Sequence, residues 1–158
     1  MGRYTFYESL HSSLHDYDLI KKIDKMSLGG IRPRRIRNDV PSSTLYDTLE
    51  KISERDEKRA LDVYSFFLDF NKTIDEIDRV TKDGAIVCMV VGNRTVKKIN
   101  IPTDVILSEL FGERGFTHIK TIIRQIPSKR LPRKSSPSNV RGDTVSTMNF
   151  EYVVILKK

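Results

Sequence analysis

The sequence contains no tryptophan, one cysteine and no long apolar run among its 158 residues. A single cysteine cannot form an intrachain disulfide, so the chain suits a reducing compartment and we expect a cytoplasmic protein. No segment reaches the roughly 20 apolar residues of a membrane helix, and the first residues lack the apolar core of an export signal. We therefore expect no membrane partner. Cys88 lies in the apolar run AIVCMVV, which predicts a small buried side chain.

Several signatures of enzyme sites are also missing. The chain has no G-x-G-x-x-G motif, no G-K-[ST] loop and no G-x-S-x-G elbow, which argues against a dinucleotide site, a nucleotide phosphate loop and a serine nucleophile. His11 and His15 are four residues apart, a spacing that suits two metal ligands on one helix face, but no cysteine or carboxylate completes the set. The residues alone predict no metal site and no catalytic residue.

Positive charge is in excess and lies mainly in two clusters, within a net charge of +7. From residue 117 onward the only carboxylates are Asp143 and Glu151, and the cations are Lys120, Arg124, Lys129, Arg130, Arg133, Lys134, Arg141, Lys157 and Lys158. The second cluster surrounds Pro33 and consists of Arg32, Arg34, Arg35 and Arg37. Localised positive charge indicates a polyanionic partner such as nucleic acid, and an ordinary solvated surface is the alternative. Proline-rich loops, unlike amphipathic helices, disfavour membrane binding.

The spacing of apolar residues predicts an α/β fold. Steps of three and four indicate helical structure over 4–26, a helix capped by Ser43 or Thr44, and a helix through 63–77, with an irregular loop over 29–43. The later segments predict a strand at 85–91, a helix from Pro102 to Gly112 or Gly115, and strands at 116–126 and 147–157. The first strand is apolar on both faces, which is typical of a central strand. This order predicts parallel crossovers and a terminal antiparallel hairpin, whose long turn is the cationic, proline-rich stretch IPSKRLPRKSSPSN.

Linked motifs in residues 60–158 resemble a known enzyme family. The segment IDEIDRVTKDGAIVCMVVGN, the helix start IPTD, and the stretches RQIPSKRLPRKSSPSN and VSTMNFEYVVILKK are similar to the C-terminal half of amino-methylating DNA methyltransferases of restriction–modification systems. GRYTFYESL and KMSLGG are similar to the segment after the catalytic motif in the N4-cytosine branch. The resemblance implies a partial Rossmann-like sheet whose last strand lies antiparallel between the other two. It also implies a helical segment with a basic loop at 1–58 and a partial class I methyltransferase domain at 59–158.

Two family features are missing from the chain. Members carry a glycine-rich loop for S-adenosyl-L-methionine and a catalytic (S/N/D)-P-P-(Y/F/W) tetrapeptide, and neither occurs here. The nearest stretch, Ser136-Pro137-Ser138-Asn139, lacks the second proline and the aromatic residue. The resemblance therefore implies part of an enzyme that is inactive alone, uses S-adenosyl-L-methionine only when complete, and either pairs with a complementary half or self-associates.

The resemblance places the loop of the last hairpin on the side where the family binds DNA. Its cations can contact phosphates, and its prolines reduce the entropy lost when an extended loop is held in place. We predict DNA contacts from Arg124, Lys129, Arg130, Arg133, Lys134 and Asn139, and from Arg32, Arg34, Arg35 and Arg37. A non-enzymatic DNA-binding or specificity module of the same fold and a basic RNA-binding α/β protein are the alternatives.

Overall fold

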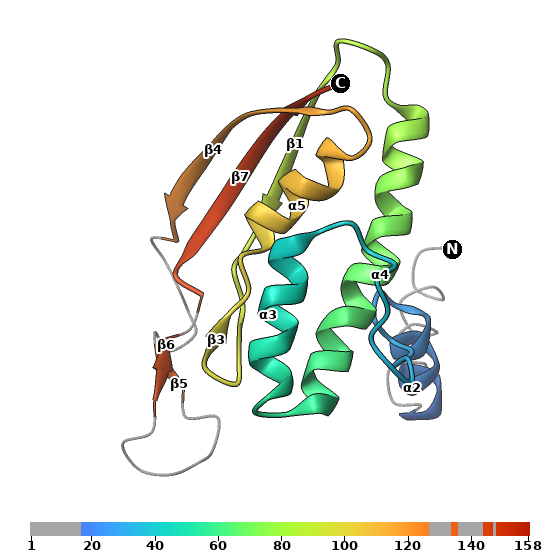
Figure 1. The fold of residues 1–158 in the computed structure, drawn as a ribbon, viewed down its shortest axis with the longest axis vertical. Helices are drawn as coiled ribbons and strands as arrows, with labels where there is room; N and C mark the ends of the chain where they lie inside the picture. Colours follow the sequence, from blue (N-terminus) through green and yellow to red (C-terminus); the bar gives the residue numbers. More distant parts are fainter. Residues whose placement is uncertain (1–16, 127–133, 136–143, 147) are drawn as a thin grey trace, which may run out of the picture.

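The computed structural model describes residues 17–126, 134–135, 144–146 and 148–158, and these form an α/β structure (Figure 1). Its helices are α2 (Tyr17–Met26), α3 (Ser43–Ser53), α4 (Glu57–Val80) and α5 (Thr103–Gly112). Its strands are β1 (Ile86–Val91), β2 (Thr95–Val96), β3 (Ile99–Asn100), β4 (Thr117–Gln125), β5 (Lys134–Ser135), β6 (Val145–Ser146) and β7 (Phe150–Lys157). No described helix is long and apolar enough to cross a membrane.

The main sheet has the strand order β1-β7-β4, as the resemblance implies. β7 runs antiparallel to both neighbours: Val90 pairs with Val153, and Val153 pairs with Ile122. β1 and β4 are therefore parallel to each other, and the chain connects them through α5. A register shift between His118 and Lys120 interrupts the otherwise regular β4–β7 ladder. The predicted α/β class, the sheet order and the terminal hairpin are confirmed.

The core lies between the helices and one face of this sheet. Val154 and Leu156 of β7 are fully buried and belong to one cluster with apolar residues of α3, α4 and α5. In α4 the cluster includes Phe67 and Ile74, which are seven residues apart as the predicted helix stripe requires. The cluster also includes Leu49 of α3, so the helical pair at 43–80 and the sheet share one hydrophobic interior.

Polar side chains fix the helix ends in this core. Ser42, one residue before the predicted cap, accepts a hydrogen bond from the Leu45 amide at 3.1 Å and so begins α3. The Ser42 hydroxyl also donates to Glu109 of α5, and so does the hydroxyl of Thr44. Since Ser42 is buried and extended, it satisfies an otherwise unpaired helix amide while linking α3 to α5.

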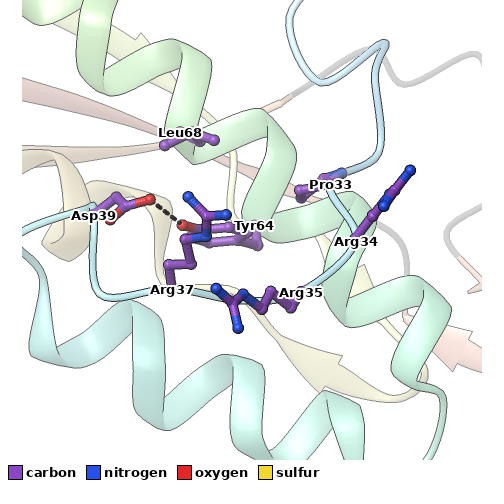
Figure 2. A pocket seen from close by; sticks show the side chains of 7 residues that line it. All are labelled: Pro33, Arg34, Arg35, Arg37, Asp39, Tyr64 and Leu68. Carbon is purple, nitrogen blue, oxygen red and sulfur yellow. Dashed lines mark hydrogen bonds between the residues drawn. The ribbon is translucent and has the colours of Figure 1, made fainter.

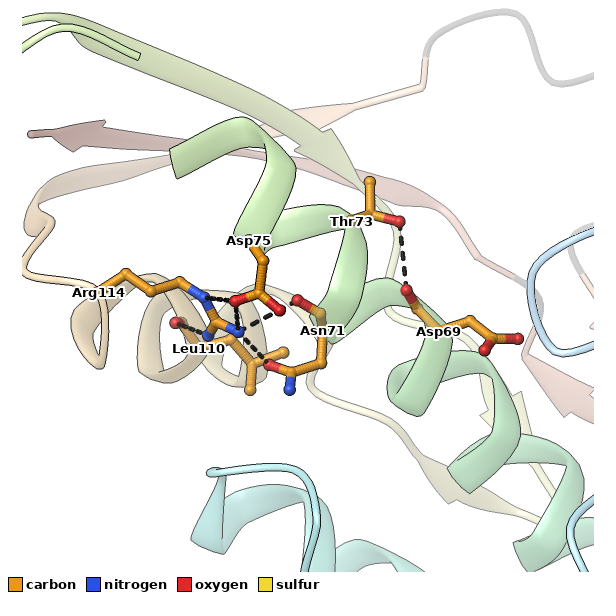
Figure 3. Close-up of polar contacts among 6 residues, drawn as sticks. All are labelled: Asp69, Asn71, Thr73, Asp75, Leu110 and Arg114. Carbon is orange, nitrogen blue, oxygen red and sulfur yellow. Dashed lines mark hydrogen bonds and ion pairs between the residues drawn. The ribbon is translucent and has the colours of Figure 1, made fainter. Parts of the chain in front are cut away.

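Arg114 joins the end of α5 to the middle of α4 (Figure 3). Its guanidinium donates to Asp75 at 2.6 and 2.8 Å, to Asn71 at 2.9 Å and 3.1 Å, and to the carbonyl of Leu110 at 2.8 Å. Only 13% of this side chain is exposed. Because the fixed fork of an arginine fits several acceptors at once, this residue sets how α5 lies against α4.

Two short antiparallel pairs were missed by the sequence patterns. β2 and β3 form a tight hairpin whose central residues, Lys97 and Lys98, have φ of 48° and 64°. Such turns normally use asparagine and glycine, so two lysines gave no turn signal. β5 and β6 pair within the connection that the sequence predicts to be one long turn.

The prediction that Cys88 is buried is wrong for this chain. β1 lies at the edge of the sheet, its residues alternate between exposed and partly buried, and Cys88 is exposed. The apolar run does form a strand, but only one of its faces meets the helices.

Candidate nucleic-acid interface

The parallel strands β1 and β4 end at the same edge of the sheet, called here the carboxyl edge. Gly92, Asn93 and Arg94 follow β1, and the connection that contains β5 and β6 follows β4 (Figure 1). In open α/β sheets, ligands bind outside the carboxyl ends of the strands, because the chain there turns away and leaves a crevice. This edge is therefore the expected position of a ligand site.

Asn93 and Asp104 hold the turn after β1 against the start of α5. The Asn93 side-chain Nδ2 donates to the Asp104 carboxylate at 2.8 Å, and the Asp104 backbone amide donates back to the side-chain Oδ1 of Asn93 at 3.3 Å. Asp104 lies in the first turn of α5, where a carboxylate is favoured by the helix dipole. The reciprocal pair anchors the residue directly before Arg94, and Arg94 itself is exposed at the carboxyl edge.

A cavity of about 440 Å³ lies between this turn, the end of α2 and α4. Gly92 and Arg94 line one side, and Phe66 and Phe67 line the other. Asp62, also on its wall, accepts from Arg32 at 2.6 Å and from Arg59 at 3.3 Å. The cavity therefore combines aromatic surface with a cationic rim at the carboxyl edge.

The loop between α2 and α3 carries the second basic cluster and is fastened at several points. The Gly29 amide donates to Asp69 at 3.1 Å, and the hydroxyl of Ser65 donates to the carbonyl of Ile31 at 2.6 Å. Further along, the hydroxyl of Tyr46 donates to the carbonyl of Arg37 at 2.7 Å. These contacts come from α3 and α4, so the loop has a defined course although it has no regular secondary structure.

The four arginines of this loop are in different electrostatic situations. The hydrogen bond from Arg32 to Asp62 raises the pKa of Arg32 and neutralises its charge locally. The side chains of Arg34, Arg35 and Arg37 have no hydrogen bond or ion pair with any residue that the structure describes. All three are exposed, which leaves three uncompensated cations within four residues.

These three arginines line a cavity of about 600 Å³ together with Pro33, Asp39, Tyr64 and Leu68 (Figure 2). Tyr64 is buried, which raises the pKa of its phenol, and its hydroxyl contacts Asp39 at 3.4 Å. Figure 2 shows Arg35 and Arg37 beside Tyr64, with Arg34 on the far side of Pro33. The arrangement offers planar cationic donors to an anion and an apolar wall behind them.

The first cluster is described only in part. Arg124, near the end of β4, pairs with Glu151 on β7 but remains 66% exposed. Lys134 lies in β5, where the backbone pairs with Ser146. Lys129, Arg130, Arg133 and Asn139 lie outside the described residues.

No metal-binding group is found in the described part of the chain, and His11 and His15 lie outside it. His118 is exposed and hydrogen-bonded to Thr121 at 2.9 Å. The sequence patterns missed Arg94 and the Asn93–Asp104 pair, although the position directly after an apolar strand was a signal that could have found both.

The chain is similar to the Type II methyltransferase M.MvaI of Kocuria varians, with 42% identity over 153 residues. The match covers 94% of this chain and 34% of the relative, so the chain spans about a third of that protein's length. The match therefore extends beyond residues 60–158, where the motif resemblance is concentrated. No family model matches the chain, and no solved structure matches it. The resemblance to the C-terminal part of a restriction–modification methyltransferase is confirmed.

Proposed function

From this similarity we propose that the chain is the C-terminal portion of a site-specific DNA methyltransferase. The complete enzyme transfers a methyl group from S-adenosyl-L-methionine to an exocyclic amine of a base. The 42% identity to a Type II methyltransferase is the observation that carries the proposal. The N4 position of cytosine is the favoured target, because GRYTFYESL and KMSLGG resemble the N4-cytosine branch.

The residues of this chain do not fit the methionine end of the cofactor. That group needs a close backbone approach, which a glycine-rich loop permits. At the carboxyl edge the only described glycine is Gly92, and the side chain of Met148 already fills the space where its Cβ would lie. We therefore assign the cofactor site and the catalytic tetrapeptide to the remaining part of the methyltransferase, and derive no chemical step from this chain.

The role proposed for this chain is to hold the DNA. Arg94 and Arg124 lie at the carboxyl edge, where the connection with Lys129, Arg130, Arg133, Lys134 and Asn139 also begins. Arg34, Arg35 and Arg37 add a second group of cations, which have no ion partner among the described residues, on a loop held by α3 and α4. Contacts with phosphates position a protein on the duplex without reading its sequence, and lysine and arginine are the usual donors.

The proposal is tested by reconstitution. The chain is mixed with the N-terminal part of M.MvaI, which supplies the segment outside the match, and transfer of a labelled methyl group from S-adenosyl-L-methionine to duplex DNA is measured. We expect transfer from the mixture and none from either polypeptide alone. Transfer by this chain alone would show that it is not a partial enzyme.

Two other outcomes separate the alternatives. DNA binding without methyl transfer in the mixture would favour a non-enzymatic DNA-binding module. Preference for RNA over duplex DNA of the same sequence would favour an RNA-binding protein. Each comparison is made at one stated salt concentration, because electrostatic affinity depends strongly on salt.

A further inference from the structure

The cavity beneath the α2–α3 loop, called here the arginine cavity, has the size of a ligand site. Its volume is about 600 Å³, and small-molecule sites commonly occupy roughly 300–1,000 Å³. Pro33 and Leu68 contribute apolar surface, and the loop arginines and Asp39 contribute polar groups (Figure 2). A double helix presents its phosphates on a convex surface, so contacts with an intact duplex would leave this hollow unused.

The loop that forms one wall of the cavity is held in place without a ligand. Ile36 packs against the core cluster, and Val40 is fully buried. The hydroxyl of Tyr46 accepts from the Val40 amide at 3.1 Å and donates to the Arg37 carbonyl at 2.7 Å. The backbone between Arg37 and Val40 is therefore fixed at both ends. A site arranged in advance loses less entropy when a ligand binds.

The charge of the cavity suits a phosphate. Arg34, Arg35 and Arg37 against the single carboxylate of Asp39 leave a net positive charge of two. A phosphate monoester carries a charge of about −1.5 to −2 at pH 7. The planar guanidinium group of arginine binds phosphate oxygens in pairs and also stacks on flat rings. These side chains therefore suit a phosphate that is attached to a ring.

Asp39 shows that the cavity is not built for phosphate alone. Its Oδ2 accepts from the hydroxyl of Tyr64 at 3.4 Å, and its carboxylate has no other hydrogen bond or ion pair with a residue that the structure describes. A carboxylate repels a phosphate but accepts from N–H groups. Asp39 would weaken a site for a bare phosphate, whereas a base that carries N–H donors can use it.

Guanine is the base that fits a carboxylate best. Its ring N1–H and its amino group are neighbouring donors on one edge, so the two oxygens of one carboxylate can accept both. Adenine and cytosine carry an amino group beside a ring nitrogen that accepts, and thymine has one N–H between two carbonyls. In a duplex this edge of guanine is paired with cytosine, so the cavity requires an unpaired guanine.

We propose that the arginine cavity binds one guanine nucleotide, with its phosphate on Arg34, Arg35 and Arg37 and its base against Leu68 and Asp39. This deepens the proposed function and rests on it for the source of the nucleotide, which is an unpaired guanine in the bound DNA. A free guanine nucleotide offers the same chemistry and is the other source that the experiments distinguish.

The first experiment is calorimetry with the chain and three probes at one ionic strength: guanosine monophosphate, adenosine monophosphate and inorganic phosphate. We expect guanosine monophosphate to bind at least ten times more tightly than either of the others. The double variant Arg35→Gln/Arg37→Gln should weaken its binding at least tenfold. Equal affinity for the three probes, or no binding of guanosine monophosphate, would overturn the inference.

Asp39→Asn separates recognition of the base from attraction of the phosphate. The asparagine can still accept from the Tyr64 hydroxyl, so the variant should melt at the temperature of the unchanged chain. We expect at least tenfold weaker binding of guanosine monophosphate, because an amide N–H₂ replaces one acceptor, and tighter binding of inorganic phosphate, because a repelling charge is lost. The matched control is Asp47→Asn, at an exposed position of α3 outside the cavity, which should change neither affinity. Tighter binding of both probes by Asp39→Asn would show that Asp39 does not contact the base.

The source of the nucleotide is tested with three duplexes of the same sequence: one fully paired, one with a single unpaired guanine and one with a single unpaired adenine. We expect the unpaired guanine to give the tightest binding and Asp39→Asn to remove this preference. Binding of guanosine monophosphate without a preference among the duplexes would support the cavity as a nucleotide site and overturn DNA as its source.

The outcomes also distinguish this inference from the proposed function. Selective binding of guanosine monophosphate by a chain that gives no methyl transfer with the N-terminal part of M.MvaI would support the cavity and contradict the proposed enzyme. Methyl transfer in that mixture, without selective binding of guanosine monophosphate by the chain, would support the enzyme and overturn the nucleotide site.

Discussion

Asp56 shows how a single residue stabilises a turn that sequence rules do not favour. It begins α4 by accepting the Arg59 amide at 3.1 Å and pairs with Lys97 at 2.9 Å. Lys97 has a positive φ, which costs free energy for any residue with a Cβ. Arg55 adds a hydrogen bond to the Lys97 carbonyl at 2.7 Å. The α3–α4 turn thus holds the β2–β3 hairpin in place.

These contacts predict a pH-dependent contribution to stability. The hydrogen bond from Lys97, and then the bond from the Arg59 amide, lower the pKa of Asp56 below its usual value of 3.8. The contribution is therefore complete above that value and is lost as the pH falls through the lower pKa of the folded state. Asp56→Asn keeps a capping side chain, so we expect it to lower the Tm at pH 7, and we expect the difference in Tm from the unchanged chain to narrow as the pH falls below 3.8.

The measurement is a series of thermal melts between pH 2 and pH 7. The same substitution is repeated in a Lys97→Met background, where the pH-dependent part of the Tm difference should shrink. A Tm difference that is the same at every pH would show that the charge of Asp56 contributes nothing.

The free arginines of the α2–α3 loop give a second prediction at this scale. If Arg34, Arg35 and Arg37 each neutralise one phosphate, changing all three to Ala should flatten the slope of log K against log salt by about 2.7 for B-DNA. The control changes three cations at the other end of the sheet, Arg79, Lys82 and Lys157, to Ala, and this should leave the slope unchanged. If both triple variants changed the slope equally, the loop would contribute to DNA binding only through the general positive charge of the protein.

At the scale of elements, the sequence predicted those that depend on periodic apolar residues. The stripe through Phe67 and Ile74 identified α4, and the apolar run of β1 identified a strand. The sequence did not predict the β2–β3 hairpin, because tertiary contacts from Asp56 and Arg55, rather than a glycine, hold its turn. It did not predict the exposure of Cys88 for another reason. The sequence shows that both faces of β1 are apolar, but it does not show which face the described chain covers.

The candidate site, like the fold, was predicted from the sequence only in part. Composition identified both cationic clusters, but it could not separate Arg32, which pairs with Asp62, from the free Arg34, Arg35 and Arg37. That distinction depends on a partner 30 residues away in the chain. Arg94 was missed because its importance comes from its position after a strand, not from a cluster of charge.

The connection between β4 and β7 is predicted to be the main DNA contact among the elements. If Lys129, Arg130, Arg133 and Lys134 each contact a phosphate, their joint replacement by Ala should flatten the salt slope by about 3.6. Affinities for one duplex are measured between about 50 and 300 mM salt for this variant and for the Arg79/Lys82/Lys157 control. An unchanged slope would mean that the connection is only a solvated turn.

For the whole molecule, the described residues form a shared core and a main sheet of three strands. Helices α3, α4 and α5 share that core with β7, whereas β1 has a free edge and an uncovered face. A partner that binds only the folded chain stabilises it by mass action, by about 2.7 kcal/mol at 100 times its Kd. Association with the remaining part of the proposed methyltransferase is therefore expected to stabilise this chain as well.

Cofactor binding is the last property that belongs to the whole molecule. A glycine-rich loop is absent from the sequence, and Gly92 is closed by Met148, so this chain offers the methionine end of S-adenosyl-L-methionine no backbone cradle. Aromatic surface in the cavity beside Phe66 can contact an adenine ring only weakly without that cradle.

We therefore expect calorimetry with the chain alone to show no binding of S-adenosyl-L-methionine tighter than about millimolar, which corresponds to about 4 kcal/mol. In the mixture with the N-terminal part of M.MvaI, binding should become measurable at micromolar concentrations. Micromolar binding by this chain alone would place the cofactor site here and contradict the division of roles between the two parts.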